Sequence, residues 1–167
     1  CAACIGIYFF GSKTSSKKNS SFSSTNLRQS GLLRQAKERS VRTIPLAGFI
    51  SHRDAEISGL AWYRDHLILL PQYPERGKPS GQARIFAIPK EELLSFLYGR
   101  TKGPITPKEI PFRGKLPKIK GYDGYEAIDF LGDQAFLTIE ATTPFMMKGY
   151  LVKAKINPDL SEIRLDT

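Results

Sequence analysis

Two stretches of the sequence place acidic and hydroxyl side chains directly before an apolar run. Glu56 and Ser58 precede one run, and Asp123 and Glu126 precede the other. Carboxylates that are brought close together repel one another, so they tend to hold a hard cation such as Ca²⁺, which takes about six to eight oxygen ligands. We therefore predict a calcium site with Glu56, Asp123 and Glu126 as its ligands, and we expect Ser58 to be a ligand-binding group beside it.

Two further polar residues end the strands that follow these runs. We expect Gln72 and Glu140 to lie at the rim of the same site as ligand-binding groups. A cation held there would polarise a phosphoryl or ester oxygen and activate a water molecule. The alternative is that each carboxylate only caps a turn or accepts backbone N–H bonds. No catalytic nucleophile is assigned, because Ser58 lacks the sequence context of a nucleophile elbow.

These residues belong to an internal repeat. Residues 57–72, ISGLAWYRDHLILLPQ, match residues 125–140, YEAIDFLGDQAFLTIE, without a gap, so each position recurs 68 residues later. Each copy is typical of a strand, a turn containing Asp, and a second strand. The same offset pairs Ile88 with Ile156. The shared pattern predicts the fold, and the positions that differ between the copies predict the site.

The segments around each copy complete it to about four strands. The continuous apolar run of residues 67–70 predicts a strand that is covered on both faces. Residues 83–89 predict a third strand, and residues 90–99 predict a short helix inserted before the fourth. Because proline cannot donate to a central ladder, residues 105–114 predict an edge strand. In the second copy, residues 142–149 predict a loop that carries apolar side chains.

One four-stranded sheet cannot cover its own faces, whereas several sheets packed around an axis can, as in a β-propeller. We predict an all-β fold for residues 42–167: a partial β-propeller of about two four-stranded antiparallel blades with a short inserted helix. Trp62 and Phe130 are expected to be core residues wedged between the blades. The starts of the innermost strands would then converge on one polar pocket. A smaller sandwich made of the two units is the alternative.

The same residues resemble the esterase-like-activity-of-phytase propeller family. Residues 58–61, Ser-Gly-Leu-Ala, are similar to the pattern with which that family begins its first blade. Residues 126–129 are similar to its later Glu-Gly-Ile-Ala pattern with Ala in place of Gly, and residues 139–140 to a strand ending in Ser-Glu with Ile in place of Ser. Where the family often has Asp, this chain has Gly124. The resemblance covers about residues 45–167 and implies hydrolysis of phosphate or carboxylic esters in a central acidic pocket.

The chain begins with an apolar run. Residues 1–10, CAACIGIYFF, are too few to span a bilayer, which needs roughly 20 residues. We expect them to be the remnant of a signal or membrane anchor on a processed chain or fragment. Lipidation of Cys1 or Cys4, as in a lipoprotein, is the alternative. The expected location is therefore outside the cytoplasm, in the periplasm or cell envelope, with the N-terminus as the link to the membrane.

Residues 11–41 predict a flexible basic linker. They are rich in serine and poor in apolar residues, so they cannot bury enough surface to offset the entropy of ordering. Residues 11–44 contain eight basic residues and one acid, which is most of the net charge of +9. The remainder is close to neutral, so we expect no nucleic-acid partner. Attraction to anionic lipid headgroups is a weaker alternative for this segment.

Several function classes are excluded by the absence of their motifs. The sequence contains no P-loop, no dinucleotide-binding glycine fingerprint and no His-Glu-x-x-His motif. Its two cysteines both lie within the first four residues, which excludes a disulfide framework and a cysteine-based zinc site. Two hypotheses remain. The first is a metal-assisted hydrolase of a small-molecule ester or phosphoester, and the second is a non-catalytic envelope propeller that binds a protein or a small ligand.

Overall fold

The computed structural model describes residues 4–6, 41–76, 82–116 and 118–166. Over these ranges the chain is mostly β with one α-helix, which confirms the all-β class predicted from the sequence. Two compact units divide the chain: residues 1–5 together with 44–167, and residues 6–43. The predicted anchor remnant at residues 1–10 lies largely outside the described residues, and so does the predicted linker at residues 11–41.

The first repeat copy belongs to an antiparallel meander of four strands. Each strand pairs with the next along the chain. The strands are β3 (Ile57–Tyr63), β4 (His66–Pro71), β5 (Arg84–Pro89) and β6 (Lys108–Arg113). The predicted inserted helix is α1 (Lys90–Leu97), which ends before Gly99 at a φ of 71°, a left-handed conformation that favours glycine. None of the described residues belongs to a helix long and apolar enough to cross a bilayer.

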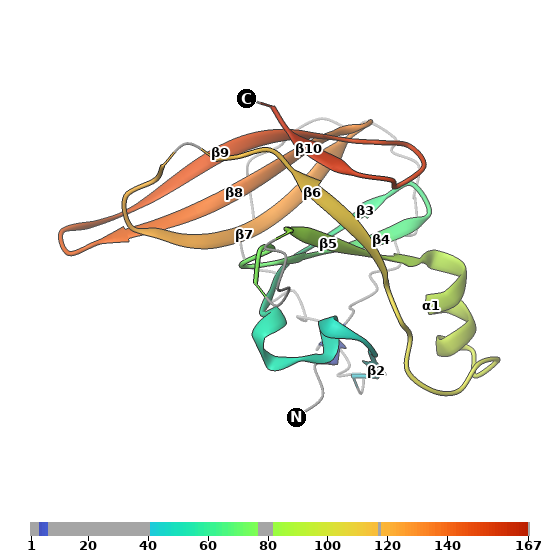
Figure 1. Cartoon of the computed structure of the whole chain (residues 1–167). Helices are drawn as coiled ribbons and strands as arrows, with labels where there is room; N and C mark the ends of the chain where they lie inside the picture. Colours follow the sequence, from blue (N-terminus) through green and yellow to red (C-terminus); the bar gives the residue numbers. More distant parts are fainter. Residues whose placement is uncertain (1–3, 7–40, 77–81, 117, 167) are drawn as a thin grey trace, which may run out of the picture. The chain divides into compact units, whose positions relative to one another are not determined.

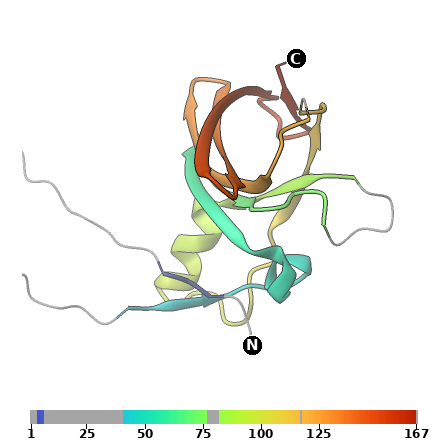
Figure 2. The ribbon, with the colours of Figure 1, turned by 90° about the vertical axis from the view of Figure 1, so that its left-hand side faces the viewer.

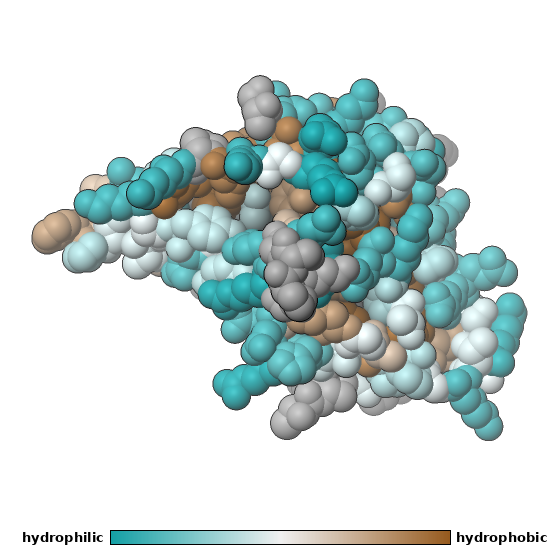
Figure 3. Space-filling model, in the orientation of Figure 1, coloured by the Kyte–Doolittle hydropathy of each residue, from teal (hydrophilic) through white to brown (hydrophobic). Residues whose placement is uncertain are grey.

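The second copy belongs to a second antiparallel meander. Its strands are β7 (Tyr122–Leu131), β8 (Gln134–Thr143), β9 (Met146–Ile156) and β10 (Ile163–Leu165). The loop predicted at residues 142–149 is wrong, because the β8–β9 ladder continues to the pair of Thr143 and Met146. These residues form the end of a projecting hairpin (Figure 1). Its apolar side chains Phe145, Met146 and Met147 are exposed, and Figure 3 shows hydrophobic surface at the tip of this hairpin.

A parallel pair joins the two meanders into one eight-stranded sheet. β10 pairs with β6, with Ile163 opposite Phe112. The strand order is β3-β4-β5-β6-β10-β9-β8-β7, and Figure 2 shows how the sheet curls until it is nearly closed. β6 is therefore not the edge strand predicted from its prolines. Pro111 lies just before the residues of β6 that pair with β10, so its missing N–H is not needed there.

The repeat is present in the backbone conformation as well as in the sequence. Both hairpins carry a β-bulge at the same position, where Ser58 and Glu126 are the extra residues. The residue two positions earlier has a positive φ in each copy, 38° at Glu56 and 104° at Gly124. Beyond the bulge the residue pairs of β3–β4 recur 68 positions later in β7–β8. The gapless sequence match therefore predicted the register of both hairpins correctly.

The third strands do not keep this offset. Ile88 lies opposite Leu67 in the first meander. The counterpart of Leu67 in the second meander is Ala135, and the residue opposite Ala135 is Ala154. The structural counterpart of Ile88 is therefore Ala154, and the predicted match between Ile88 and Ile156 is wrong by two residues. A long loop follows β4 whereas a tight turn follows β8, so the repeat does not control the register beyond the hairpin.

The two meanders stack with unlike faces in contact. Ile128 belongs to the core between the meanders, and so does Leu137 opposite it. The counterparts Leu60 and Leu69 lie on the face of the first meander that points away from this core. We call the face of each meander that carries Leu60 or Ile128 its front face. The front faces of both meanders point in the same direction, so the meanders stack back to front.

The back-to-front stacking corrects one predicted core residue. Phe130 packs against the core, with its ring 5.1 Å from that of Tyr63. Trp62 was expected to be its buried equivalent but is 45% exposed. It lies at the edge of the front face of the first meander, beyond the segments that cover the middle of that face. Tyr63, which points to the opposite face, is the buried aromatic residue of β3.

The first meander is covered on both faces, as predicted for β4. Ile68 and Leu70 belong to the core between the meanders, and Leu67 and Leu69 are buried on the other side. α1 and the short 3₁₀-helices η1 (Phe49–Ser51) and η2 (Arg53–Ala55) lie on that side (Figures 1 and 2). β2 (Thr43–Pro45), which pairs with β1 (Cys4–Gly6), precedes them.

The back face of the second meander is open to solvent. Among its exposed polar residues are Asp129, Thr138 and Lys153, at positions where the first meander has Ala61, Leu70 and Ala87. Two exposed apolar side chains lie among them, Leu131 and Leu151. A half-polar surface of this kind is typical of a solvated sheet face.

Candidate functional site

The starts of β3 and β7 lie side by side, as predicted, and polar residues gather around them. A carbon atom added at Gly59 would lie 3.1 Å from the backbone nitrogen of Ile128 and 3.2 Å from Cα of Ala127, so only glycine allows the two strands to lie this close. Five of the six residues predicted for the site take part in a network of polar contacts near this crossing: Glu56, Gln72, Asp123, Glu126 and Glu140.

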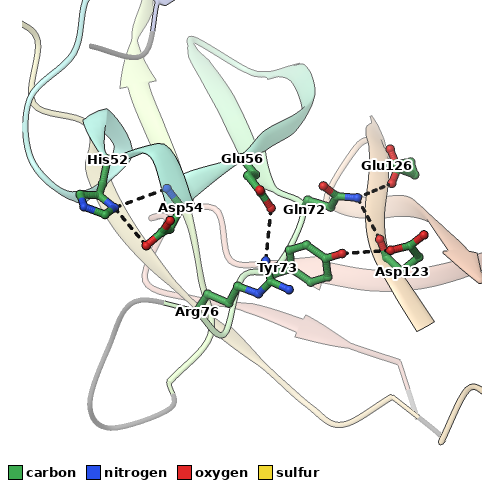
Figure 4. A network of polar contacts seen from close by, with 8 residues as sticks. All are labelled: His52, Asp54, Glu56, Gln72, Tyr73, Arg76, Asp123 and Glu126. Atoms are coloured by element: carbon green, nitrogen blue, oxygen red, sulfur yellow. Dashed lines mark hydrogen bonds and ion pairs between the residues drawn. The ribbon is translucent and has the colours of Figure 1, made fainter. Parts of the chain in front are cut away.

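Gln72 is the centre of this network (Figure 4). Its Nε2 donates to Oε1 of Glu126 at 3.0 Å and to the carbonyl oxygen of Asp123 at 2.9 Å. Its own carbonyl accepts the backbone N–H of Tyr125 at 2.8 Å. Gln72, which sequence reasoning placed on the rim, is the first residue after β4 and therefore connects this end of β4 to the beginning of β7, where both acceptors of its side-chain amide lie.

The Asp123 carboxylate is also held by protein donors. The Tyr73 hydroxyl donates to Oδ1 at 3.1 Å, and Thr142 Oγ1 lies 3.4 Å from Oδ2. The same Thr142 oxygen is 3.3 Å from Oε1 of Glu140, so one hydroxyl lies between the two acids. Burial, together with the hydrogen bond to Asp123, raises the pKa of Tyr73 above its ordinary value, so the phenol stays a donor.

Glu56 is attached to the network through Arg76. Its Oε2 lies 3.3 Å from NH1 of Arg76, whose guanidinium stacks on the ring of Tyr73 at 3.3 Å. Its backbone oxygen accepts the N–H of Gln72 at 2.8 Å. Figure 4 also shows His52, whose Nδ1 accepts the backbone N–H of Asp54 and so begins η2 apart from this network. Glu56 thus faces Arg76 rather than the other acids.

Ser58 has a local role in the bulge. Its hydroxyl is 3.4 Å from the carbonyl oxygen of Leu70, on the strand paired with its own. Its counterpart Glu126 occupies the same bulge position but reaches Gln72 across the gap between the meanders. The bulge therefore directs the side chain at this position out of the regular alternation in both copies, and the residue type decides what the side chain contacts.

Protein donors already occupy part of the donor set predicted for Ca²⁺. Where a cation would have to lie between Glu126 and Asp123, the Gln72 amide donates hydrogen bonds instead. Within the described ranges no group of three or more His, Cys, Asp and Glu side chains is placed to hold a metal ion. The residues of the network satisfy one another, so we derive no chemical step through a metal.

Gly124 explains why the network has this geometry. A carbon atom added there would clash with the Gln72 side chain and lie 2.8 Å from the Gln72 carbonyl oxygen, and φ is already 104°. An Asp at this position, as in the family that the sequence resembles, would not fit against Gln72. The glycine that departs from that pattern is therefore the residue that leaves room for Gln72.

A cavity of about 670 Å³ lies next to the network. The ring of Tyr122 packs edge-on against Tyr73 at 6.2 Å, so one aromatic contact separates the polar network from the cavity wall. The cavity is lined by residues from five separate segments: Pro74, Glu75, Gln82, Ala83, Phe112, Arg113, Gly114, Lys115, Leu116, Ile119, Tyr122, Tyr125 and Leu165. Its volume is in the range of sites that enclose a small organic molecule.

Two tyrosines contribute phenol groups to the cavity lining. Burial raises the pKa of both Tyr122 and Tyr125 well above the ordinary phenol value, and the negative charge of Glu75 adds to the shift. Tyr125 packs against Phe112 at 5.4 Å and against Tyr122 at 6.2 Å. In the part of the chain that the structure describes, neither phenol hydroxyl donates a hydrogen bond to a protein acceptor. Both phenols are therefore neutral, and both residues line the cavity.

Sequence reasoning missed this cavity. The signal that it left unused is the stretch RGKLPKIKGYDGY, residues 113–125, in which four basic residues alternate with apolar residues before two tyrosines. Such a segment covers an apolar space while presenting charge at its edge. The remaining lining residues come from distant segments, and only the fold brings them together.

The comparisons with known proteins add no family to this description. Searches against protein-family models, curated proteins and solved structures return no match for this chain.

Proposed function

We propose that this chain is a non-catalytic, propeller-type binding module that holds a small ligand in the cavity beside the starts of β3 and β7. The single observation that carries the proposal is the cavity itself, with an aromatic and aliphatic lining and two phenol donors. Pockets that bind small molecules have this composition: apolar walls with a few placed polar groups. A protein partner at the cell envelope is the variant of this proposal that the cavity favours less.

The propeller-type reading is supported by the back-to-front stacking of the meanders. Blades of a propeller are related by rotation, so the back of one blade meets the front of the next. Ile128 and its counterpart Leu60 have this relation. The resemblance of residues 58–61 and 126–129 to the phytase-like propeller family supports the same reading. The parallel β6–β10 pair is a feature that propeller blades, which touch through side chains, do not share.

The polar network supports a structural role next to the cavity. Gln72 and Tyr73 follow β4, and both donate to the beginning of β7. They fix the position of Tyr122 and Tyr125, the two residues of β7 that line the cavity. These hydrogen bonds form when the chain folds. They therefore hold the residues of the binding site in position without a metal.

The cavity can be tested with a neutral apolar fluorophore, N-phenyl-1-naphthylamine, and two matched Leu→Trp variants. Leu116 lines the cavity, so Leu116→Trp places a larger ring in the binding space. Leu131 is 74% exposed on the back face of the second meander, so Leu131→Trp is the control. We expect saturable binding by the native chain and by Leu131→Trp, and loss of binding by Leu116→Trp with an unchanged circular dichroism spectrum. Absence of saturable binding by the native chain would reject the function.

Metal-assisted hydrolysis of a phosphate or carboxylic ester is the second candidate. It is favoured by the gathering of Asp123, Glu126 and Glu140 around Gln72 and Thr142. Titration of the chain with CaCl₂ in a calorimeter tests it, with Glu126→Gln as the variant. Heat of binding that disappears in Glu126→Gln, together with calcium-dependent release of p-nitrophenol from a model ester, would favour the hydrolase over the binding module.

An exported location at the cell envelope is part of the proposal. Its support is the apolar run of residues 1–10 followed by a basic segment. Fractionation of cells that express the chain with and without residues 1–10 tests it, and the membrane fraction should lose the protein when these residues are removed.

A further inference from the structure

We propose that the cavity takes an amphipathic anion: a molecule with an apolar body and a carboxylate or phosphate group at one end. The inference names the ligand class of the cavity and so rests on the proposed function. It comes from the difference between the walls of the cavity, which are apolar and aromatic, and the basic segment that follows β6 along one side.

The walls fit an apolar body. Phe112, Leu116, Ile119 and Leu165 contribute aliphatic and aromatic surface, and Ala83 leaves space between them. Burial of apolar ligand surface here contributes about 25 cal/mol per Å² of area removed from water. The wall residues do not favour one apolar shape over another. They therefore contribute more to the affinity for a ligand than to the choice of ligand.

The charged groups at the cavity favour a negative ligand. Arg113 and Lys115 both line it, and Glu75 is the acid among the lining residues. Arg113 lies 4.0 Å from Glu162, which offsets part of its charge. For Lys115 no ion pair is present within the described part of the chain.

The two phenols complete the recognition of an anion. A neutral phenol donates a hydrogen bond to a carboxylate or phosphate oxygen, and charge-assisted bonds of this kind are about twice as strong as neutral ones. Tyr122 and Tyr125 both line the cavity. An alkylammonium ligand would leave Lys115 beside a like charge, and a neutral alcohol would make no use of it.

Isothermal titration of the whole chain with octanoate, octyl phosphate, 1-octanol and octylamine tests the ligand class. Because the four probes share one apolar body, differences between them report the head group alone. We expect octanoate or octyl phosphate to bind about tenfold more tightly than octanol, the effect of one charge-assisted contact, and octylamine to bind most weakly. The ratio of the two anions decides between a carboxylate and a phosphate ligand.

Two lysine variants locate the charge. Lys115→Gln should lower the affinity for the tighter anion about tenfold and leave octanol binding unchanged. Lys118→Gln is the matched control, because Lys118 is exposed and does not line the cavity. Tyr125→Phe, which keeps the buried ring, should also weaken the anion more than the alcohol.

The outcomes separate the two proposals. If octanol binds as tightly as the anions, or if Lys115→Gln and Lys118→Gln have equal effects, the anion inference is wrong and the cavity function stands. If none of the four probes binds but N-phenyl-1-naphthylamine does, the anion inference is wrong and the cavity function stands; if the fluorophore does not bind either, both are wrong.

Discussion

The hairpins β3–β4 and β7–β8 are two copies of one backbone that bury opposite faces. They share a left-handed residue, a bulge and a two-residue turn at matching positions. Yet Ile128 is buried and its counterpart Leu60 is 44% exposed, while Tyr63 is buried and its counterpart Leu131 is 74% exposed. Local sequence sets the conformation of each hairpin, and the stacking of the meanders decides which side chains matter for stability. Matched substitutions in the two copies can measure this division.

The largest expected difference is between the two counterparts on the front faces. Ile128→Ala should lower the free energy of unfolding by about 2–5 kcal/mol, because it removes buried methyl groups from the core between the meanders. Leu60→Ala should cost about 1 kcal/mol or less, since that side chain is largely exposed. Urea denaturation measures both. Equal effects would contradict the back-to-front stacking.

The next difference is between the left-handed residues before the bulges. Gly124→Ala should destabilise the chain by about 2–4 kcal/mol, because a Cβ meets Gln72 and a positive φ is strained for alanine. Glu56→Ala keeps a side chain at a position that already tolerates one and removes only an exposed ion pair with Arg76, so its cost should be below about 1 kcal/mol. The control is the double variant Gly124→Ala, Gln72→Ala, which should recover part of the loss.

A third difference concerns Tyr63, which donates to Oδ1 of Asp133 at 2.6 Å. Tyr63→Phe should cost about 1–2 kcal/mol, whereas Leu131→Ala at the counterpart position should cost almost nothing. The hydrogen bond lowers the pKa of Asp133 below 3.8 and, with burial, raises the pKa of Tyr63 to about 12.

The same contact predicts a pH dependence with two limits. A lowered carboxyl pKa stabilises the folded state above pH 3.8, and this contribution is lost as the pH falls through the folded-state value. A raised phenol pKa stabilises it below pH 10.0, and this contribution is lost as the pH rises toward about 12. Guanidinium denaturation across pH should show both losses in the native chain and weaker ones in Tyr63→Phe. Unchanged profiles would show that the contact is absent in solution.

The smallest difference is expected at the turns. Gly132 has a φ of 59° and Arg64, its counterpart, a φ of 50°. Gly132→Ala should cost about 1 kcal/mol, because alanine is strained in the left-handed region. Arg64→Gly relieves the same strain but loses an exposed contact with Asp133, so its net effect should lie within about 0.5 kcal/mol of zero. Thermal unfolding of the two variants gives the comparison.

The sequence predicted those parts of the fold that depend on neighbours along the chain. The hairpins, the inserted helix and the closeness of Ser58 and Glu126 follow from alternation, turn residues and a gapless repeat. The two-residue shift at Ile88 and the parallel β6–β10 pair depend on loop lengths and on strand ends far apart, which no local pattern encodes. The exposed Trp62 has the same cause, since a face is buried only if another segment reaches it.

The candidate site shows the same limit. The structure brings Gln72 and Glu126 into contact, whereas the chemistry predicted for the site was assigned from carboxylates alone. An amide can donate as well as accept, and Gln72 Nε2 donates to the Glu126 carboxylate that was expected to bind a cation. The cavity was not predicted because its walls come from five segments that are separated by up to 91 positions, from Pro74 to Leu165.

In back-to-front stacking, a meander that packs its front face against one neighbour leaves its back face free for another. The stacking itself therefore does not limit the number of meanders. A fully apolar back face would therefore favour a further meander stacked on it. Asp129 and Lys153 lie on the back face of the second meander where the first meander has Ala61 and Ala87. Burying two charges beneath another meander is costly, so this back face is less suited to stacking than that of the first meander.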